Sequence, residues 1–178
     1  MSRIVTPALE TATGATAEVY AQVKKAAGRV PNAYAAIGAH GPAALGAILQ
    51  ADGVLAAGSL DKQDRETVKL AVSVAAGCDY CVAAHSMMGK MAGLSPETLK
   101  RIRAGEPTGD AKRDALIRFV RTLATTRGTL DLAELSAIRA AGYTDAQLVD
   151  IALAMAVIVF TNVFNRINDT TIDFPAVA

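Results

Sequence analysis

The stretch ETVKLAVSVAAGCDYCVAAH, residues 66–85, determines both the fold and the chemistry that the sequence predicts. It contains both cysteines of the chain, Cys78 and Cys81, and one of its two histidines, His85. An apolar segment with helical spacing precedes the cysteines, and Gly77 stands directly before Cys78. Because glycine at such a place commonly ends a helix, we expect one helix before Gly77 and a second that begins at the Cys-x-x-Cys pair.

A reversal of the chain at Gly77 would make these two helices an antiparallel hairpin. Glu66 would then lie ~16 Å along one arm and His85 ~12 Å along the other, at 1.5 Å per residue. A single straight helix would instead place Glu66 ~18 Å from Cys78, too far to act there. The hairpin therefore predicts that Glu66 lies beside His85, where its carboxylate orients the imidazole and holds its proton.

The spacing of Cys78, Cys81 and His85 places all three side chains on one face of the second helix. Thiols at positions i and i+3 can close into a disulfide. The unpaired amides at a helix N-terminus and a nearby imidazole both favour thiolate, so we expect a lowered pKa for one or both thiols. Thiolate is the form that attacks peroxides and disulfides.

Two other interpretations of the cysteine pair were weighed against redox chemistry. The cysteines could be small buried hydrophobic residues, and Glu66 alone could be an acid favoured by the helix dipole. A zinc site could use the two thiolates, His85 and Glu66, but a structural zinc site normally has a second Cys/His pair, which this sequence lacks. We therefore favour a redox pair over a zinc site.

Composition limits the classes of function that remain. The 178 residues are 52% hydrophobic, which suits a single domain spanning 1–178, with residues 1–14 as a flexible or partner-contacting arm. Eighteen basic and 17 acidic residues give a net charge of +1, so no nucleic-acid partner is expected. The N-terminus lacks an apolar signal segment, and the apolar run at 151–160 is shorter than the ~20 residues that span a bilayer. We expect a cytoplasmic protein with no membrane partner.

The remaining pattern predicts an all-α protein, a bundle of about seven or eight helices. The residues that start and stop helices place the other elements at 17–28, after Pro31, at 42–57, from Pro96, at 111–128, within 130–142 and at 145–168. In the last of these, Asn162, Asn165 and Asn168 recur at i, i+3 and i+6. They could face the active site or a partner subunit, or simply solvate the end of the helix.

The pattern Glu66-x11-Cys78-x2-Cys81-x3-His85 resembles the alkylhydroperoxidase D-like (AhpD-like) family, in the carboxymuconolactone decarboxylase superfamily. The segments RVPNAYAAIGAHGPAAL, AGLSPETL, RAAGYTDAQLVDI and NVFNRINDTTIDFP extend the resemblance over most of the chain. It implies an AhpD-like helical bundle that assembles as a homo-oligomer, either a trimer or a hexamer. It also implies a thiol peroxidase that needs no cofactor, takes a hydroperoxide as substrate and is regenerated by a dithiol reductant.

Carried over to this sequence, the resemblance makes Cys81 the peroxide-reactive thiol and Cys78 the resolving thiol, with Glu66 and His85 as a proton relay. The spacing by itself does not fix which thiol attacks, and Cys78, nearer the start of the helix, is the alternative. One residue departs from the best-studied branch of the family, which has a second histidine where this chain has Tyr80. Tyrosine does not exchange protons near neutral pH in the same way.

The function that we expect is therefore an antioxidant thiol peroxidase, an oxidoreductase. The main alternative is a dithiol–disulfide oxidoreductase or redox sensor with little peroxidase activity. A lyase of the carboxymuconolactone decarboxylase type is less favoured, because that branch does not depend on a Cys-x-x-Cys pair.

Overall fold

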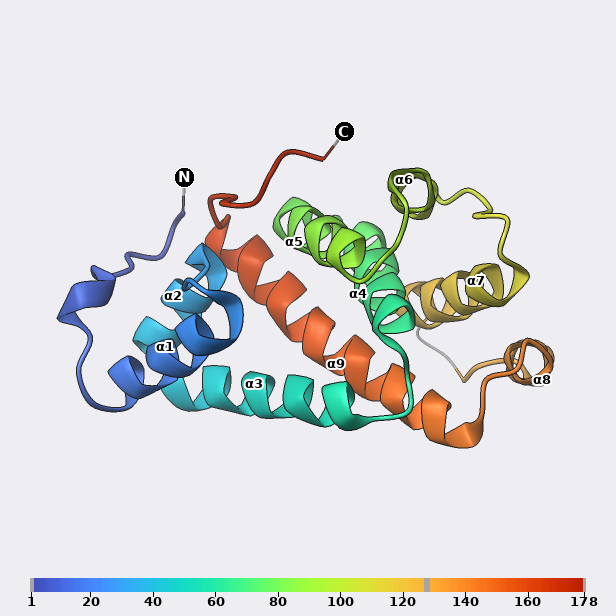
Figure 1. Ribbon diagram of the computed structural model, residues 1–178, viewed down its shortest axis with the longest axis horizontal. Helices are drawn as coiled ribbons and strands as arrows, with labels where there is room; N and C mark the ends of the chain where they lie inside the picture. The colour runs from blue at the N-terminus through green and yellow to red at the C-terminus, as the bar shows by residue number, and fades with distance from the viewer. Residues whose placement is uncertain (1, 127–128, 178) are drawn as a thin grey trace.

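A computed structural model describes residues 2–126 and 129–177 (Figure 1). Within these residues the chain is all-helical, with nine α-helices, one short 3-10 helix at Leu9–Thr11 and no strand. The number of helices exceeds the estimate of about seven or eight, although each of the nine lies in a segment for which the sequence predicts a helix. The helices are α1 (Gly14–Ala27), α2 (Asn32–His40), α3 (Pro42–Ala57), α4 (Lys62–Ala75), α5 (Asp79–Met91), α6 (Pro96–Ala104), α7 (Ala111–Thr125), α8 (Leu132–Ala140) and α9 (Asp145–Asn168). The helix predicted at 111–128 ends at residues 127–128, which lie outside the described residues.

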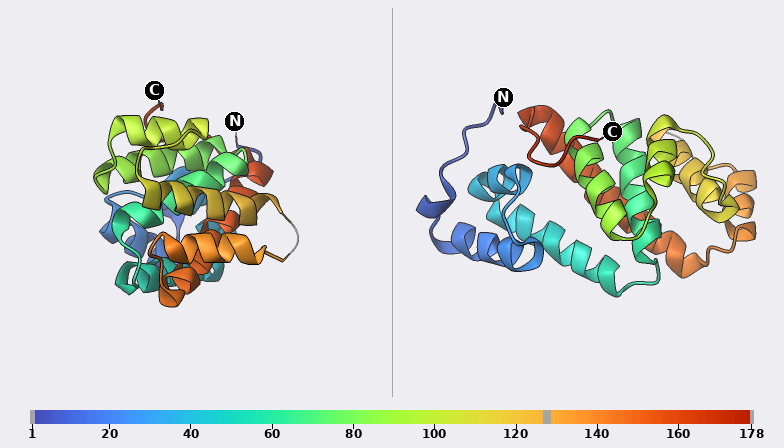
Figure 2. Two further views of the ribbon diagram at one scale, coloured as in Figure 1. Left: turned by 90° about the vertical axis from the view of Figure 1, so that its right-hand side faces the viewer. Right: turned by 45° about the horizontal axis from the view of Figure 1, so that its top comes forward.

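The chain reverses at Gly77, and α4 and α5 lie side by side in all views (Figures 1 and 2). Gly77 has a φ of +62°, in the left-handed region that costs glycine little. The Gly77 amide donates to the Val74 carbonyl at 3.0 Å, and the Cys78 amide donates to the Ser73 carbonyl at 3.1 Å. These bonds close the last turn of α4 and aim the chain back along it. The predicted hairpin is confirmed.

Helix α4 lies at the centre of the core and packs against α5, α7 and α9. Its apolar side chains Val68, Leu70 and Val72 are at most 1% exposed. Three charged residues of the same helix, Asp64, Glu66 and Lys69, are also buried. A buried charge is costly unless it is paired, so each of these side chains must have a partner. For Lys69 that partner is Asp52 of α3, at 2.6 Å.

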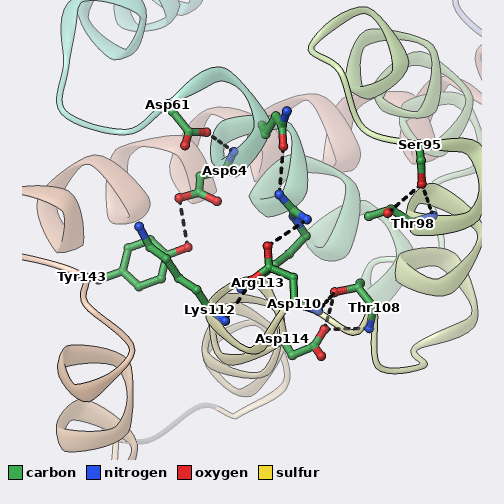
Figure 3. Close-up of polar contacts among 11 residues, drawn as sticks. Asp61, Asp64, Ser95, Thr98, Thr108, Asp110, Lys112, Arg113, Asp114 and Tyr143 are labelled. Carbon is green, nitrogen blue, oxygen red and sulfur yellow. Dashed lines mark hydrogen bonds and ion pairs between the residues drawn. The ribbon is translucent and has the colours of Figure 1, made fainter.

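A polar cluster joins the N-terminal end of α4 to α7 and to the turn before α9 (Figure 3). The Tyr143 hydroxyl donates to Asp64 at 2.9 Å, and Arg113 donates to Gln63 at 2.9 Å. Burial raises the pKa of Asp64 above its ordinary value, although the Tyr143 bond opposes the shift. The Lys112 ammonium lies 4.7 Å from the centre of the Tyr143 ring. These contacts hold the helix turn that carries Glu66.

Helix α9 crosses the middle of the molecule (Figure 1), and a capping box of Thr144 and Gln147 starts it. By length and composition, its 24 residues are enough to span a membrane, whereas the apolar run at 151–160 alone is too short. The core helix of a soluble protein meets the same criterion. Only 33% of its most apolar window is buried within the chain. The exposed apolar side chains form a row along one face of α9, comprising Val149, Ala152, Ala156, Val159, Val163 and Ile167.

Both ends of the chain meet at the C-terminal end of α9. The Arg3 amide donates to the Asn168 carbonyl at 2.7 Å, and the Ile4 amide donates to the Asn168 side chain at 2.7 Å. The segment predicted as an arm is therefore tied to α9 by residues 2–4. Beyond α9 the tail has no regular structure and returns over α2 and α5. This return places tail residues next to the cysteines' helix.

Candidate active site

The structure brings Glu66 of α4 and His85 of α5 together in the core. Oε2 of Glu66 lies 2.8 Å from Nδ1 of His85, and the two residues are 8% and 9% exposed. The hairpin allows this contact because Gly89, one turn beyond His85, lets α5 approach its neighbours. A Cβ at Gly89 would lie 2.8 Å from a Leu99 methyl and 3.8 Å from Glu66 Cβ. With Nδ1 bound to Glu66, Nε2 is the ring nitrogen left for substrate chemistry.

The Glu66 carboxyl is held in its ionised form by its neighbours. Burial acts to raise its pKa, but the charge and hydrogen bond of His85 outweigh burial, with smaller contributions from Lys69 and Arg65. The pKa of Glu66 therefore lies below its ordinary value. A carboxylate in this position fixes the orientation of the imidazole ring.

Cys78 and Cys81 are free thiols, each 3% exposed, at the start of α5. Cys78 is the N-cap residue with extended backbone, and Cys81 lies in the first helical turn. A hydrogen bond from the Cys81 thiol lowers the pKa of Cys78 to about 6, against the effect of burial and with help from the Cys81 amide and Asn162. The same hydrogen bond, together with burial and the Cys78 charge, raises the pKa of Cys81. The ionised pair thus shares one proton between its two sulfurs.

Asparagines of α9 complete the surroundings of the thiols. Nδ2 of Asn165 donates to Cys81 Sγ at 3.3 Å, and Asn162 donates to Ser73 Oγ at 3.1 Å and lowers the pKa of both thiols. Oδ1 of each of these two asparagines is buried without a hydrogen-bond partner among the described residues. Asn168 instead holds Ile4 and the tail. Of the alternatives that the spacing left open, facing the active site is correct for Asn162 and Asn165.

A cavity of about 280 Å³ opens beside Cys81 and His85. Neither Cys78 nor Glu66 lines it, so a molecule in this cavity meets Cys81 first. The wall is mostly apolar and comes from four helices and the tail, including Tyr34, Ala84, Met87, Met88, Met91, Asn165 and Phe174. Larger hollows occur elsewhere, such as one of about 470 Å³ beside Arg118 and Arg121, but none of these is lined by a thiol.

The structure brings Glu66, Cys78, Cys81 and His85 together, as the sequence predicts, but several residues of the cavity were not predicted. Phe174 and Tyr34 carry no local signal, because they reach the site only through the packing of the tail and of α2. Within residues 2–126 and 129–177, no group of three or more His, Cys, Asp or Glu side chains is arranged to hold a metal ion.

Comparisons with known proteins agree with this fold. Residues 42–120 match the model of the carboxymuconolactone decarboxylase family. No curated protein matches the chain in sequence. The alkylhydroperoxidase AhpD core structure of an uncharacterised peroxidase-related protein from Ralstonia eutropha JMP134 has a TM-score of 0.84 at 24% identity, over 97% of this chain and 92% of that chain.

Two further solved structures share the fold. A peroxidase-related protein from Silicibacter sp. TM1040 superposes with a TM-score of 0.78 at 21% identity, over 95% of this chain and 92% of that chain. A cysteine-to-alanine variant of the debrominase Bmp8, in complex with 2,3,4-tribromopyrrole, superposes with a TM-score of 0.80 at 19% identity, over 97% of this chain and 93% of that chain. The resemblance read from the sequence is confirmed: residues 42–120 match the carboxymuconolactone decarboxylase family, and the chain has the AhpD-like fold.

Proposed function

We propose that the protein is a thiol peroxidase that reduces organic hydroperoxides with the Cys78–Cys81 pair. One observation carries the proposal. Cys81 and His85 line the same apolar cavity, and Nδ1 of His85 binds Glu66. Cys78 does not line the cavity but is hydrogen-bonded to Cys81 as a second thiol. This arrangement supports the proposal, because a nucleophile and a proton donor would share one opening and a resolving thiol would lie within reach.

The first step is attack by Cys81. Above pH 6 the pair carries one negative charge, and transfer of the shared proton along the S–H···S bond to Cys78 leaves thiolate at Cys81. Asn165 donates a hydrogen bond to that sulfur. The thiolate attacks the terminal oxygen of ROOH, the O–O bond breaks, and protonated His85 gives its proton to the leaving alkoxide. The products are a sulfenic acid at Cys81 and the alcohol ROH.

The second step is resolution by Cys78. Its sulfur attacks Cys81 Sγ, the S–OH bond breaks, and the departing hydroxide takes the Cys78 proton to form water. The Asn162 hydrogen bond, which also lowers the pKa of Cys78, does not depend on the Cys81 thiol and favours Cys78 as the nucleophile in this step. The unpartnered Oδ1 of Asn165 supports the intermediate, because a sulfenic hydroxyl supplies the donor that this buried oxygen lacks. An external dithiol then reduces the disulfide, so the cycle converts ROOH and two thiol hydrogens into ROH and water.

The test is stoichiometric oxidation of the reduced protein. One equivalent of tert-butyl hydroperoxide should remove both free thiols and yield a peptide with a Cys78–Cys81 disulfide, together with one equivalent of alcohol. Cys78→Ser and Cys81→Ser should each form no intramolecular disulfide. Unchanged thiols after hydroperoxide treatment, or full turnover in both serine variants, would contradict the proposal.

A second candidate is reductive dehalogenation of a halogenated aromatic compound. The apolar cavity next to Cys81 favours it, as does the shared fold with a debrominase that binds 2,3,4-tribromopyrrole. The electron balance is the same, since two thiols become a disulfide while the carbon–bromine bond becomes carbon–hydrogen and bromide leaves. Bromide release from tribromopyrrole without hydroperoxide turnover would favour this candidate over the peroxidase.

A further inference from the structure

The tail contributes one wall of the cavity. Residues 171–174, which we call the strap, follow α9 and return across α2 and α5 (Figure 1). Phe174 of the strap lines the cavity that contains Cys81 and His85. Its ring meets the Tyr80 ring edge-on, with centroids 5.4 Å apart and an interplanar angle of 82°. The Arg29 guanidinium lies over the Phe174 ring, 5.0 Å from its centroid. Two side chains from outside the tail therefore fix this aromatic wall.

Asp173 binds the strap to Arg29, Asn32 and Tyr80, and we call this group of contacts the latch. Its Oδ1 accepts a hydrogen bond from the Tyr80 hydroxyl at 2.8 Å, and its Oδ2 accepts one from the Asn32 amide at 3.1 Å. Arg29 pairs with the same carboxylate and also donates to the Asp173 carbonyl at 2.7 Å. The Asn32 amide is one of the unpaired donors at the start of α2, so the carboxylate serves as an N-cap supplied from the tail. Charge-assisted bonds of this kind are among the stronger ones.

Tyr80, between the two cysteines, connects this latch to the thiols. It is 6% exposed, and its hydroxyl accepts the Ala33 amide at 3.1 Å while it donates to Asp173. Burial raises the pKa of Tyr80, so the hydroxyl keeps the proton that it donates to Asp173. A tyrosine at this position therefore has a definite task, which is to hold the strap against the helix that carries both thiols.

We infer that Phe174, held in place by Asp173 and Tyr80, is the specificity-determining residue that limits the size of the molecule reaching Cys81. This inference rests on the proposed peroxidase. At ~30 Å³ per water, the cavity has room for roughly nine waters, or a substrate body of about ten heavy atoms. Arg29 is already neutralised by Asp173, so the wall offers no free charge from this pair to an anion. The substrate class is an uncharged, compact hydroperoxide with an apolar body.

The experiment compares a compact and an oversized uncharged hydroperoxide, tert-butyl hydroperoxide and methyl linoleate hydroperoxide. In Phe174→Ala the ratio of kcat/KM for the large to the small substrate should rise roughly tenfold, the scale on which apolar pockets discriminate by size. Tyr80→Phe should raise the same ratio less, because the ring remains while the latch loses its hydroxyl. Val177→Ala, a tail variant whose side chain does not line this cavity, should leave the ratio unchanged.

A second measurement separates failure of the inference from failure of the proposed function. Alkylation of Cys81 by N-methylmaleimide and by N-pyrenylmaleimide, located by peptide mapping, reports access without any peroxide chemistry. A large-to-small rate ratio that rises in Phe174→Ala supports the strap even where hydroperoxide turnover is absent, in which case only the proposed function fails. Ratios that stay at the wild-type value in both assays would overturn the inference while leaving a working peroxidase intact.

Discussion

Replacing Cys81 with alanine removes the largest contribution that lowers the pKa of Cys78. That contribution is the hydrogen bond from the Cys81 thiol to the Cys78 sulfur, and it brings the pKa of Cys78 to about 6 from a reference value of 9.0. Hydrogen bonds to charged groups contribute about 1.5–3 kcal/mol. At 1.36 kcal/mol per pKa unit, their loss corresponds to ~1–2 units. Cys78 in Cys81→Ala should therefore titrate at roughly 7–8.

Cys81→Ser is the matched control for this experiment. The serine hydroxyl keeps a donor at the same place, so the pKa of Cys78 should rise by less than in the alanine variant. The assay is ultraviolet thiolate absorbance as a function of pH, paired with the pH dependence of Cys78 alkylation by iodoacetamide. The reasoning is refuted if Cys78 keeps a pKa of about 6 in Cys81→Ala, or if the two variants titrate alike.

Three further predictions concern the relay, the polar cluster and α9. Glu66→Gln should lower kcat by about 10²-fold and destabilise the fold by about 1–3 kcal/mol at neutral pH. Because the folded-state pKa of Glu66 lies below its reference value of 4.5, this stability difference should be complete above that value and disappear as pH falls through the folded-state pKa, as urea titrations at several pH values would detect. Tyr143→Phe leaves the buried Asp64 carboxyl without its donor and should cost about 1–3 kcal/mol in chemical denaturation, with kcat of the folded enzyme unchanged. The row on α9 is an exposed apolar surface that a second copy of the chain can cover, so light scattering should find a homo-oligomer that Val159→Asp disrupts and that a substitution at exposed Glu10 does not.

The central hairpin could be predicted because its signals are local. Gly77 marks the reversal, and the distances of Glu66 and His85 from it differ by only ~4 Å, which their side chains bridge to meet at 2.8 Å once the helices run antiparallel. The caps of α4 and α9 were likewise visible as short-range patterns. Each of these features depends on residues within one or two helices.

Features that depend on distant segments could not be predicted in the same way. Tyr80 binds Asp173 across 93 positions of sequence, and Asn165 reaches Cys81 across 84, so neither contact leaves a periodic signal. The asparagine spacing showed that the side chains share a face of α9, but not which part of the core that face meets. The pKa difference between the two thiols also required the structure, because it depends on which sulfur donates to the other.

The most direct test of the account is the location of the first oxidised sulfur. Cys78→Ser keeps the cavity-lining thiol and removes the resolving one, so one equivalent of tert-butyl hydroperoxide should produce a sulfenic acid at Cys81 that dimedone traps and peptide mass analysis locates. Cys81→Ser should form no dimedone adduct at Cys78 at a comparable rate, because Cys78 does not line the cavity. A rapid adduct at Cys78 in Cys81→Ser, with none at Cys81 in Cys78→Ser, would contradict the assignment of Cys81 as the attacking thiol.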